Sequence, residues 1–228
     1  MIELDNISWQ HPQKDDSPAL SHISLTLPQG SFCWLFGHSG SGKSSLLKLL
    51  HLERLPSEGR MVILDHEITT HTTRDTLLHL RQKIGIIYQN PSLIPNLSIA
   101  KNIALPLRLH HYPEEMIKKE VGAIIRWFGL TEQARRPTSC LSHGERQLTA
   151  IARAVVHRPQ IILADEPTNS LDDAQAKRIL DMFFKLNKIG ITVIIATHNR
   201  SLIQERDDPI LNLAHGQLFD PTTPQKQI

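Results

Sequence analysis

The stretch Gly37-His38-Ser39-Gly40-Ser41-Gly42-Lys43-Ser44 decides the fold of this chain. It follows the apolar run of residues 31–36 and precedes a helix that the pattern predicts over residues 43–50. The spacing G-x-x-x-x-G-K-[ST] between a strand and a helix is typical of a phosphate-binding loop. Its glycines let backbone N–H groups converge on phosphate oxygens, and the helix N-terminus adds a favourable dipole. A Gly/Ser-rich turn without a ligand is the simpler alternative, and the context makes it the weaker one.

The side chains at the end of this loop suit a nucleotide that carries a metal ion. Lys43 supplies a cation for the β- and γ-phosphates, and the Ser44 hydroxyl is a ligand for Mg²⁺. We therefore predict that residues 37–44, together with Ser45, contact ATP.

Strand-like apolar runs alternate with helical segments on both sides of the loop, which predicts an α/β fold with a largely parallel sheet. The other runs cover residues 1–7, 22–27, 60–64, 84–88, 160–164 and 192–196, and a closing hairpin covers 210–213 and 217–219. Residues 90–140 differ, because prolines replace the strand pattern and an amphipathic helix runs from Pro113 to Gly129. We predict one domain with a nucleotide-binding core at 1–89 and 141–219. A helical insert occupies 90–140, and a frayed tail follows at 220–228.

Composition excludes several classes of protein. The 228 residues carry 25 Lys+Arg against 23 Asp+Glu, and a net charge of +2 gives no electrostatic footprint for nucleic acid or anionic lipid. A membrane span needs about 20 consecutive apolar residues, and the best local run, residues 191–197, is far shorter. We therefore expect any link to a membrane to go through a partner. With only two cysteines, Cys33 and Cys140, we expect a reducing compartment.

Polar residues follow three predicted strands. Asp165 and Glu166 end an apolar strand, where the first acid suits Mg²⁺ binding and the second suits orienting or deprotonating a water. A solvated strand end is the alternative for this pair, but the phosphate loop earlier in the chain favours catalysis. Gln89 and His198 also follow strands, so in a parallel sheet they face the same crevice. Gln89 then reaches Mg²⁺ or the attacking water, and His198 bonds the γ-phosphate.

The segment Leu141-Ser142-His143-Gly144-Glu145 begins another helix, with Ser142 as its cap. A capped helix start with a nearby glycine is also a second anion site. Because one nucleotide cannot use both this site and the Lys43 loop, we predict that Ser142 and Gly144 contact ATP across an interface with a second copy of the chain.

In this order, the motifs resemble those of ATP-binding cassette (ABC) transporter ATPases, and the resemblance covers about residues 1–219. Residues 37–44 look like Walker A, Gln89 like the Q-loop and residues 141–145 like the signature. Residues 161–165 look like Walker B with Glu166 as the catalytic glutamate, Ser170-Leu171-Asp172 resembles the D-loop, and His198 resembles the switch histidine. The resemblance implies a P-loop core with an antiparallel β subdomain and a helical subdomain. It also implies Mg²⁺-dependent ATP hydrolysis, with Ser44, Gln89 and Asp165 as metal ligands and Lys43 among the catalytic residues.

The same resemblance implies an ATP-dependent homodimer and an integral membrane permease-like partner at the cytoplasmic face of the membrane. Within the family, the closest resemblance is to the ATP-binding proteins of cell division, and the ATPases of lipoprotein release and macrolide efflux are near relatives. An ATP-gated dimerising scaffold with little hydrolysis is a further alternative, since His143 stands where the signature usually has glycine. The aromatic position that stacks on adenine aligns with His11, and Trp9 is the other candidate.

Overall fold

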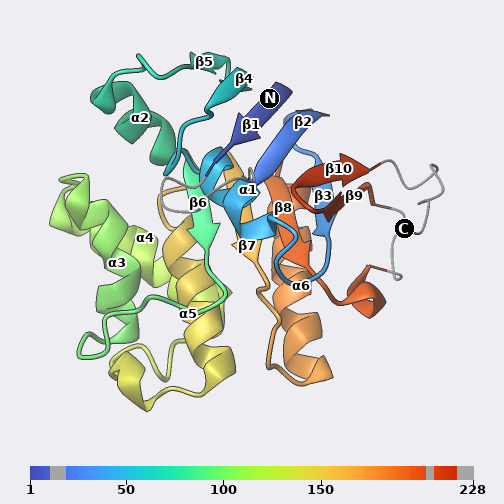
Figure 1. Cartoon of the computed structure of the whole chain (residues 1–228). Coiled ribbons are helices and arrows are strands. Elements are labelled where there is room, and N and C mark those ends of the chain that lie inside the picture. Colours follow the sequence, from blue (N-terminus) through green and yellow to red (C-terminus); the bar gives the residue numbers. More distant parts are fainter. Residues whose placement is uncertain (11–18, 204–207, 220–228) are drawn as a thin grey trace.

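The computed structural model describes residues 1–10, 19–203 and 208–219. The described strands form two sheets, and helices pack around them (Figure 1). The predicted α/β class is therefore confirmed. The predicted tail at 220–228 and the candidate His11 lie outside the described residues.

The larger sheet has the strand order β10-β9-β3-β8-β7-β6. Neighbouring strands from β9 to β6 pair in parallel, and the terminal hairpin of β9 and β10 is antiparallel, as the sequence predicts. Because β3, β8 and β7 are adjacent, the residues that follow them meet at one edge of the sheet. The bounds are β3 (Phe32–Phe36), β6 (Ile84–Ile87), β7 (Ile161–Asp165), β8 (Thr192–Thr197), β9 (Ile210–Ala214) and β10 (Gln217–Phe219).

The smaller sheet has the order β2-β1-β4-β5 and antiparallel pairing throughout. Its strands are β1 (Ile2–Trp9), β2 (Leu20–Leu27), β4 (Glu58–Ile63) and β5 (His66–Ile68). Alternate residues of β1 turn inward, and Leu4 joins Leu47 of the first helix and Leu163 of β7 in one apolar cluster. The antiparallel β subdomain that the resemblance implies is therefore present.

Six α-helices are described: α1 (Lys43–Leu50), α2 (Arg74–Arg81), α3 (Ile99–Leu109), α4 (Glu114–Trp127), α5 (His143–Val155) and α6 (Asp173–Lys188). Two 3₁₀ turns cover Thr138–Cys140 and Arg200–Leu202. Helix α1 has the predicted bounds, and α4 occupies the segment for which the pattern predicts a helix. Gly129 follows α4 with φ +66°, the left-handed conformation that commonly ends a helix.

Residues 90–140 contain α3 and α4, which pack with α5 to one side of the larger sheet (Figure 1). The sequence predicts α4 but names no helix at α3, because Pro106 lies inside it. Ile99, Ile103 and Leu107 recur at four-residue spacing and are buried in the core, which compensates for the proline.

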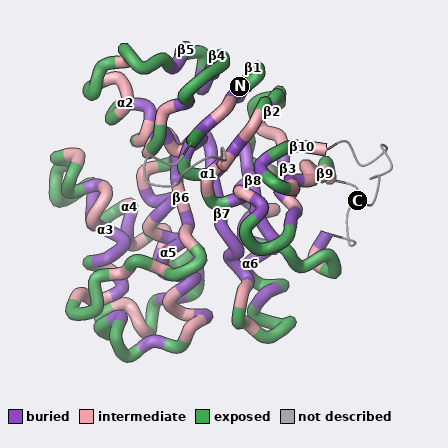
Figure 2. Tube along the Cα trace, in the orientation of Figure 1, coloured by how far each residue is buried: buried purple, intermediate pink, exposed green. Residues whose placement is uncertain are grey.

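Burial is concentrated in the central strands (Figure 2). Every residue of β7 and β8 is buried, as expected for strands that are covered on both faces. The strands that end at Asp165 and Thr197 are therefore buried along their whole length. Within the described parts of the chain, no helix combines the length and apolar character that a membrane span requires.

Candidate active site

The phosphate-binding loop connects β3 to α1 and encloses the Lys43 ammonium. Lys43 is buried, and its Nζ donates to the carbonyl oxygens of Gly37 at 2.7 Å and His38 at 3.1 Å. Gly42 has φ +107°, and a Cβ on Gly37 would lie 2.3 Å from the Leu213 carbonyl oxygen. Both positions therefore require glycine, and the loop folds tightly around its lysine.

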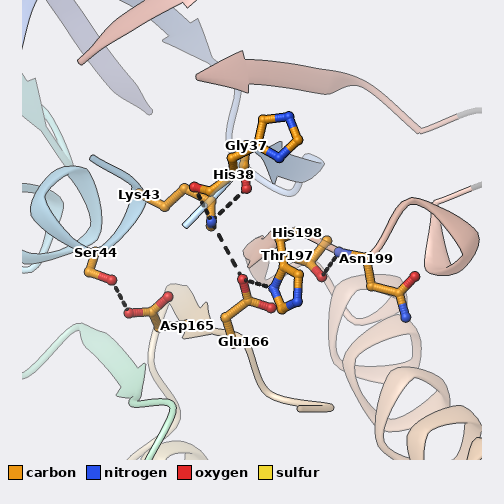
Figure 3. Close-up of polar contacts among 9 residues, drawn as sticks. All are labelled: Gly37, His38, Lys43, Ser44, Asp165, Glu166, Thr197, His198 and Asn199. Atoms are coloured by element: carbon orange, nitrogen blue, oxygen red, sulfur yellow. Dashed lines mark hydrogen bonds and ion pairs between the residues drawn. The ribbon is translucent and has the colours of Figure 1, made fainter. Parts of the chain in front are cut away.

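Asp165 ends β7 and reaches the first turn of α1. The Ser44 hydroxyl donates to Asp165 Oδ2 at 2.6 Å (Figure 3). Burial raises the pKa of the Asp165 carboxyl above its usual value, although the bond from Ser44 acts in the opposite direction. A hydroxyl and a carboxylate held together are the oxygen donors that Mg²⁺ prefers, so these residues fit the ion that the resemblance implies.

Glu166 is the centre of the polar contacts. Its Oε1 lies 3.5 Å from Lys43 Nζ and accepts a hydrogen bond from His198 Nδ1 at 2.8 Å (Figure 3). The side chain is buried, and its backbone has φ +46°, which is uncommon for a residue with a Cβ. The Glu166 amide donates to the Ala196 carbonyl oxygen of β8 at 2.9 Å, which holds this conformation. Backbone strain of this kind persists where the surrounding structure over-determines it, often at functional sites.

A cleft of about 850 Å³ brings the predicted residues together. This volume is in the range of small-molecule sites. Gln89, which follows β6, lines the cleft with Asp165, Glu166 and His198. Its further lining residues are Trp9, Ala19, Ser39, Gly40, Gly42, Lys43, Ser44, Ser45, Asn169, His215 and Gly216.

Four of these lining residues are ones that the sequence analysis does not predict for the site: Ala19, Asn169, His215 and Gly216. The Gly216 amide donates to the Ser41 carbonyl oxygen at 3.0 Å, so the β9–β10 turn is fixed against the phosphate loop. The sequence predicts this turn, but nothing in its pattern indicates which loop it contacts. Trp9 lies at the cleft, whereas His11 is outside the described residues, so the choice between them for adenine stacking stays a prediction.

Ser142 and Gly144, which are predicted to contact ATP of a second copy, do not line the Lys43 cleft. Ser142 caps α5 in a reciprocal capping box, accepting from the Glu145 amide at 3.2 Å while Glu145 Oε2 accepts from the Ser142 amide at 2.8 Å. Ser142 and Gly144 line a separate pocket of about 100 Å³ together with Gln175 and other residues. No residue of this pocket lines the Lys43 cleft. A Cβ on Gly144 would lie 2.6 Å from Oε1 of Gln175 in α6, so any larger residue would displace the Gln175 side chain.

The family model for ABC transporters matches residues 20–169. Together with the fold and the phosphate loop, this match shows that the chain belongs to the ABC transporter family, as an ATP-binding domain.

Curated relatives of two kinds, FtsE and MetN 1, align with nearly the whole of this chain. The cell division ATP-binding protein FtsE of Escherichia coli is 39% identical over 218 residues, which cover 96% of this chain and 97% of FtsE. FtsE of Haemophilus influenzae is 37% identical over 219 residues, covering 96% of this chain and 99% of FtsE. The methionine import ATP-binding protein MetN 1 of Bacillus cereus is 37% identical over 225 residues, 98% of this chain, and the chain spans 65% of MetN 1.

Solved structures agree with this family. A dimeric structure of the ATP-binding cassette MJ0796, in a post-hydrolysis state bound to ADP and Pi, superposes with a TM-score of 0.87 at 32% identity. The alignment covers 96% of this chain and 97% of MJ0796. The cbiO1 protein from Clostridium perfringens gives a TM-score of 0.86 at 27% identity, covering 96% and 86% of the two chains. The expected P-loop ABC ATPase fold is confirmed.

Proposed function

We propose that the chain is a Mg²⁺-dependent ATPase that hydrolyses ATP in a homodimer and drives a membrane partner. One observation carries the catalytic part: the buried Glu166 carboxylate contacts both Lys43 and His198 in the cleft that also holds Asp165. Phosphoryl transfer to water requires a base, a cation and a carboxylate that binds the metal ion. All three lie beside the phosphate-binding loop.

Each residue has a distinct role in this proposal. The loop amides and Lys43 bind the β- and γ-phosphates, and Glu166 orients the attacking water and accepts its proton. His198 holds the Glu166 carboxylate in place through Nδ1, and in its doubly protonated form its other ring nitrogen donates to the γ-phosphate. Ser44, Asp165 and Gln89 hold Mg²⁺, which when bound neutralises charge on the phosphate oxygens.

The homodimer supplies the second half of each site. Ser142 is exposed at the start of α5, where backbone N–H groups and the helix dipole attract an anion. Its pocket is separate from the Lys43 cleft of the same chain, and in this proposal a second subunit brings the two together around one ATP. The dimeric structures of MJ0796 support a dimer of this chain.

For the cellular role we propose an FtsE-type subunit of a cell-division complex that regulates peptidoglycan hydrolysis. Its partner is an FtsX-like integral membrane protein, which holds it at the cytoplasmic face of the cell membrane. The support is 37–39% identity across nearly the full FtsE chains. Methionine import is the second candidate, because MetN 1 is equally similar but extends well beyond the aligned region. The ATPases of lipoprotein release and macrolide efflux remain further alternatives on resemblance alone.

Dimerisation is tested with Ser142→Asp in a Glu166→Gln background. Aspartate still caps a helix but places a negative charge where the proposal puts a phosphate. The Glu166→Gln chain is expected to form dimers with ATP in light scattering after size exclusion, and adding Ser142→Asp is expected to abolish them. Binding of a fluorescent ATP analogue to the monomer stays unchanged, because Ser142 does not line that cleft.

Ser98→Asp is the matched control, since Ser98 caps α3 in the same way by accepting from the Lys101 amide. This control is expected to leave the ATP-dependent dimer intact. If the dimer persisted in Ser142→Asp, the proposal that Ser142 contacts the ATP of the other subunit would be wrong. Affinity purification of the chain tests the cellular role. An FtsX-like protein is expected to co-purify with it, and a methionine permease is not.

A further inference from the structure

A polar cluster joins the end of α1 to the end of β6. We define the Glu53 cluster as His51, Glu53 and Tyr88. Glu53 Oε1 accepts a hydrogen bond from the Tyr88 hydroxyl and another from His51 Nδ1 at 2.8 Å. Tyr88 directly precedes Gln89, so these bonds attach the start of the Gln89 segment to the helix that carries the phosphate loop.

An unusual backbone turn aims Glu53 at Tyr88. Leu52 is buried and has φ +61°, a left-handed conformation that is uncommon for leucine. The Leu52 amide donates to the Leu49 carbonyl oxygen, and the Glu53 amide donates to that of Lys48, both at 2.9 Å. Arg81 Nη2, at the end of α2, donates to the Leu52 carbonyl oxygen at 2.5 Å. The turn is thus fixed from two helices, and the carboxylate has a defined direction.

Charge strengthens the contact to Tyr88. Burial acts to raise the pKa of Glu53, but the hydrogen bonds from Tyr88 and His51 outweigh it and lower the pKa overall. At neutral pH Glu53 is therefore an anion and Tyr88 a neutral donor, and such charge-assisted hydrogen bonds are stronger than neutral ones.

We propose that Glu53 is a positioning residue for Gln89, acting through Tyr88. The inference rests on the proposed function, in which Gln89 faces the metal ion and the attacking water. Gln89 is exposed at the cleft, so its own surroundings restrain it little, whereas the residue before it is held by a partly buried carboxylate contact. The same helix then positions Lys43 and Ser44 at one end and, through Glu53, Gln89 at the other.

Tyr88→Phe and Glu53→Gln test this role. Tyr88→Phe removes the donor of the bond, and Glu53→Gln removes the negative charge of its acceptor, while both keep the shape of the side chain. We expect kcat to fall roughly tenfold in Tyr88→Phe, which loses one hydrogen bond to a charged group, with little change in KM for ATP. A smaller fall is expected in Glu53→Gln, which keeps an acceptor for the Tyr88 hydroxyl but loses its charge. In a Gln89→Ala background, Tyr88→Phe is expected to cause no further fall, because it acts only through Gln89. A general loss of stability would instead lower kcat in both backgrounds and would contradict the positioning role.

The chain provides matched controls. Tyr112→Phe changes its other tyrosine, which is exposed between α3 and α4, and Glu67→Gln changes an exposed glutamate paired with Arg60. Both are expected to keep the parental kcat. Unchanged kcat in Tyr88→Phe and Glu53→Gln, while Gln89→Ala is slow, would overturn the inference and leave the ATPase proposal intact.

A second readout does not depend on hydrolysis. A spin label at Gln89→Cys, in a Cys140→Ser background that removes the exposed thiol, reports the mobility of this segment. Tyr88→Phe is expected to increase that mobility, and an unchanged spectrum would overturn the inference. If the parental chain failed to hydrolyse ATP, the proposed function would fail, and the spectrum would still decide whether Glu53 restrains this segment.

Discussion

Replacing Glu166 by glutamine removes the proposed base while changing the site very little. Glutamine has nearly the same shape, and its amide oxygen can still accept the hydrogen bond that His198 Nδ1 donates at 2.8 Å. Lys43 loses an anionic neighbour at 3.5 Å but keeps its bonds to the Gly37 and His38 carbonyl oxygens. The phosphate loop should therefore stay folded and bind ATP.

The expected effect is on turnover alone. Loss of a general base slows a reaction roughly 10²–10⁴-fold. This range corresponds to about 3–5 kcal/mol in the activation free energy. The buried, strained position of Glu166 favours the upper part of the range, because no other carboxylate of the described chain contacts both Lys43 and His198.

Phosphate release at saturating Mg²⁺ and ATP measures this effect, and retention of labelled ATP after gel filtration measures binding. We expect Glu166→Gln to retain ATP and to release phosphate at least a hundredfold more slowly than the parent, roughly the lower limit for a lost base. Glu67→Gln, which removes an exposed carboxylate far along the smaller sheet, should hydrolyse ATP at the parental rate. Parental turnover in Glu166→Gln would refute the reasoning, because the carboxylate would then not be the base.

Three further predictions concern binding and stability. Gly216→Ala should weaken ATP binding in calorimetry, because φ is +74° and the new Cβ would lie 2.8 Å from the Ala19 carbonyl oxygen beside the phosphate loop; unchanged affinity would contradict this. Asn102→Ala should destabilise the chain by about 2–4 kcal/mol in urea unfolding. The buried Asn102 side chain accepts a hydrogen bond from the Ile94 amide and donates to the carbonyl oxygens of Ile94, Leu97 and Ser98, and alanine can replace none of these bonds. Burial, with the nearby His110 and His51, lowers the pKa of His157 to about 4. The unfolded chain, with an ordinary pKa near 6.5, then binds the proton first, so stability should fall by at most about 3 kcal/mol from pH 6.5 to pH 4. In His157→Asn this part of the pH dependence should disappear.

The phosphate loop could be predicted from the sequence because its contacts are local. Lys43 Nζ bonds carbonyl oxygens only five and six residues earlier, and α1 begins where the motif requires a helix. The buried strands β7 and β8 are recognisable from continuous apolar runs, which predict strands covered on both faces. The acids at the end of β7 then follow from the geometry of a parallel sheet.

Other elements depend on distant partners. Helix α3 forms despite Pro106, because burial of one face outweighs the local cost of proline. The short strand β5 and helices α2 and α6 lie where the sequence analysis names no element. Their local patterns are weaker than those of the central strands, and packing against the rest of the chain selects their conformation.

By itself, the sequence determined the class of fold and most of the polar residues that line the cleft, because these residues lie in short motifs that follow recognisable strands. Only the tertiary structure decided that Glu53 holds Tyr88 across 35 residues, that the His215 turn closes on the phosphate loop, and that Ser142 faces a different pocket from Lys43. These relations join segments distant along the chain. They follow from how the sheets and helices pack, which no local pattern encodes.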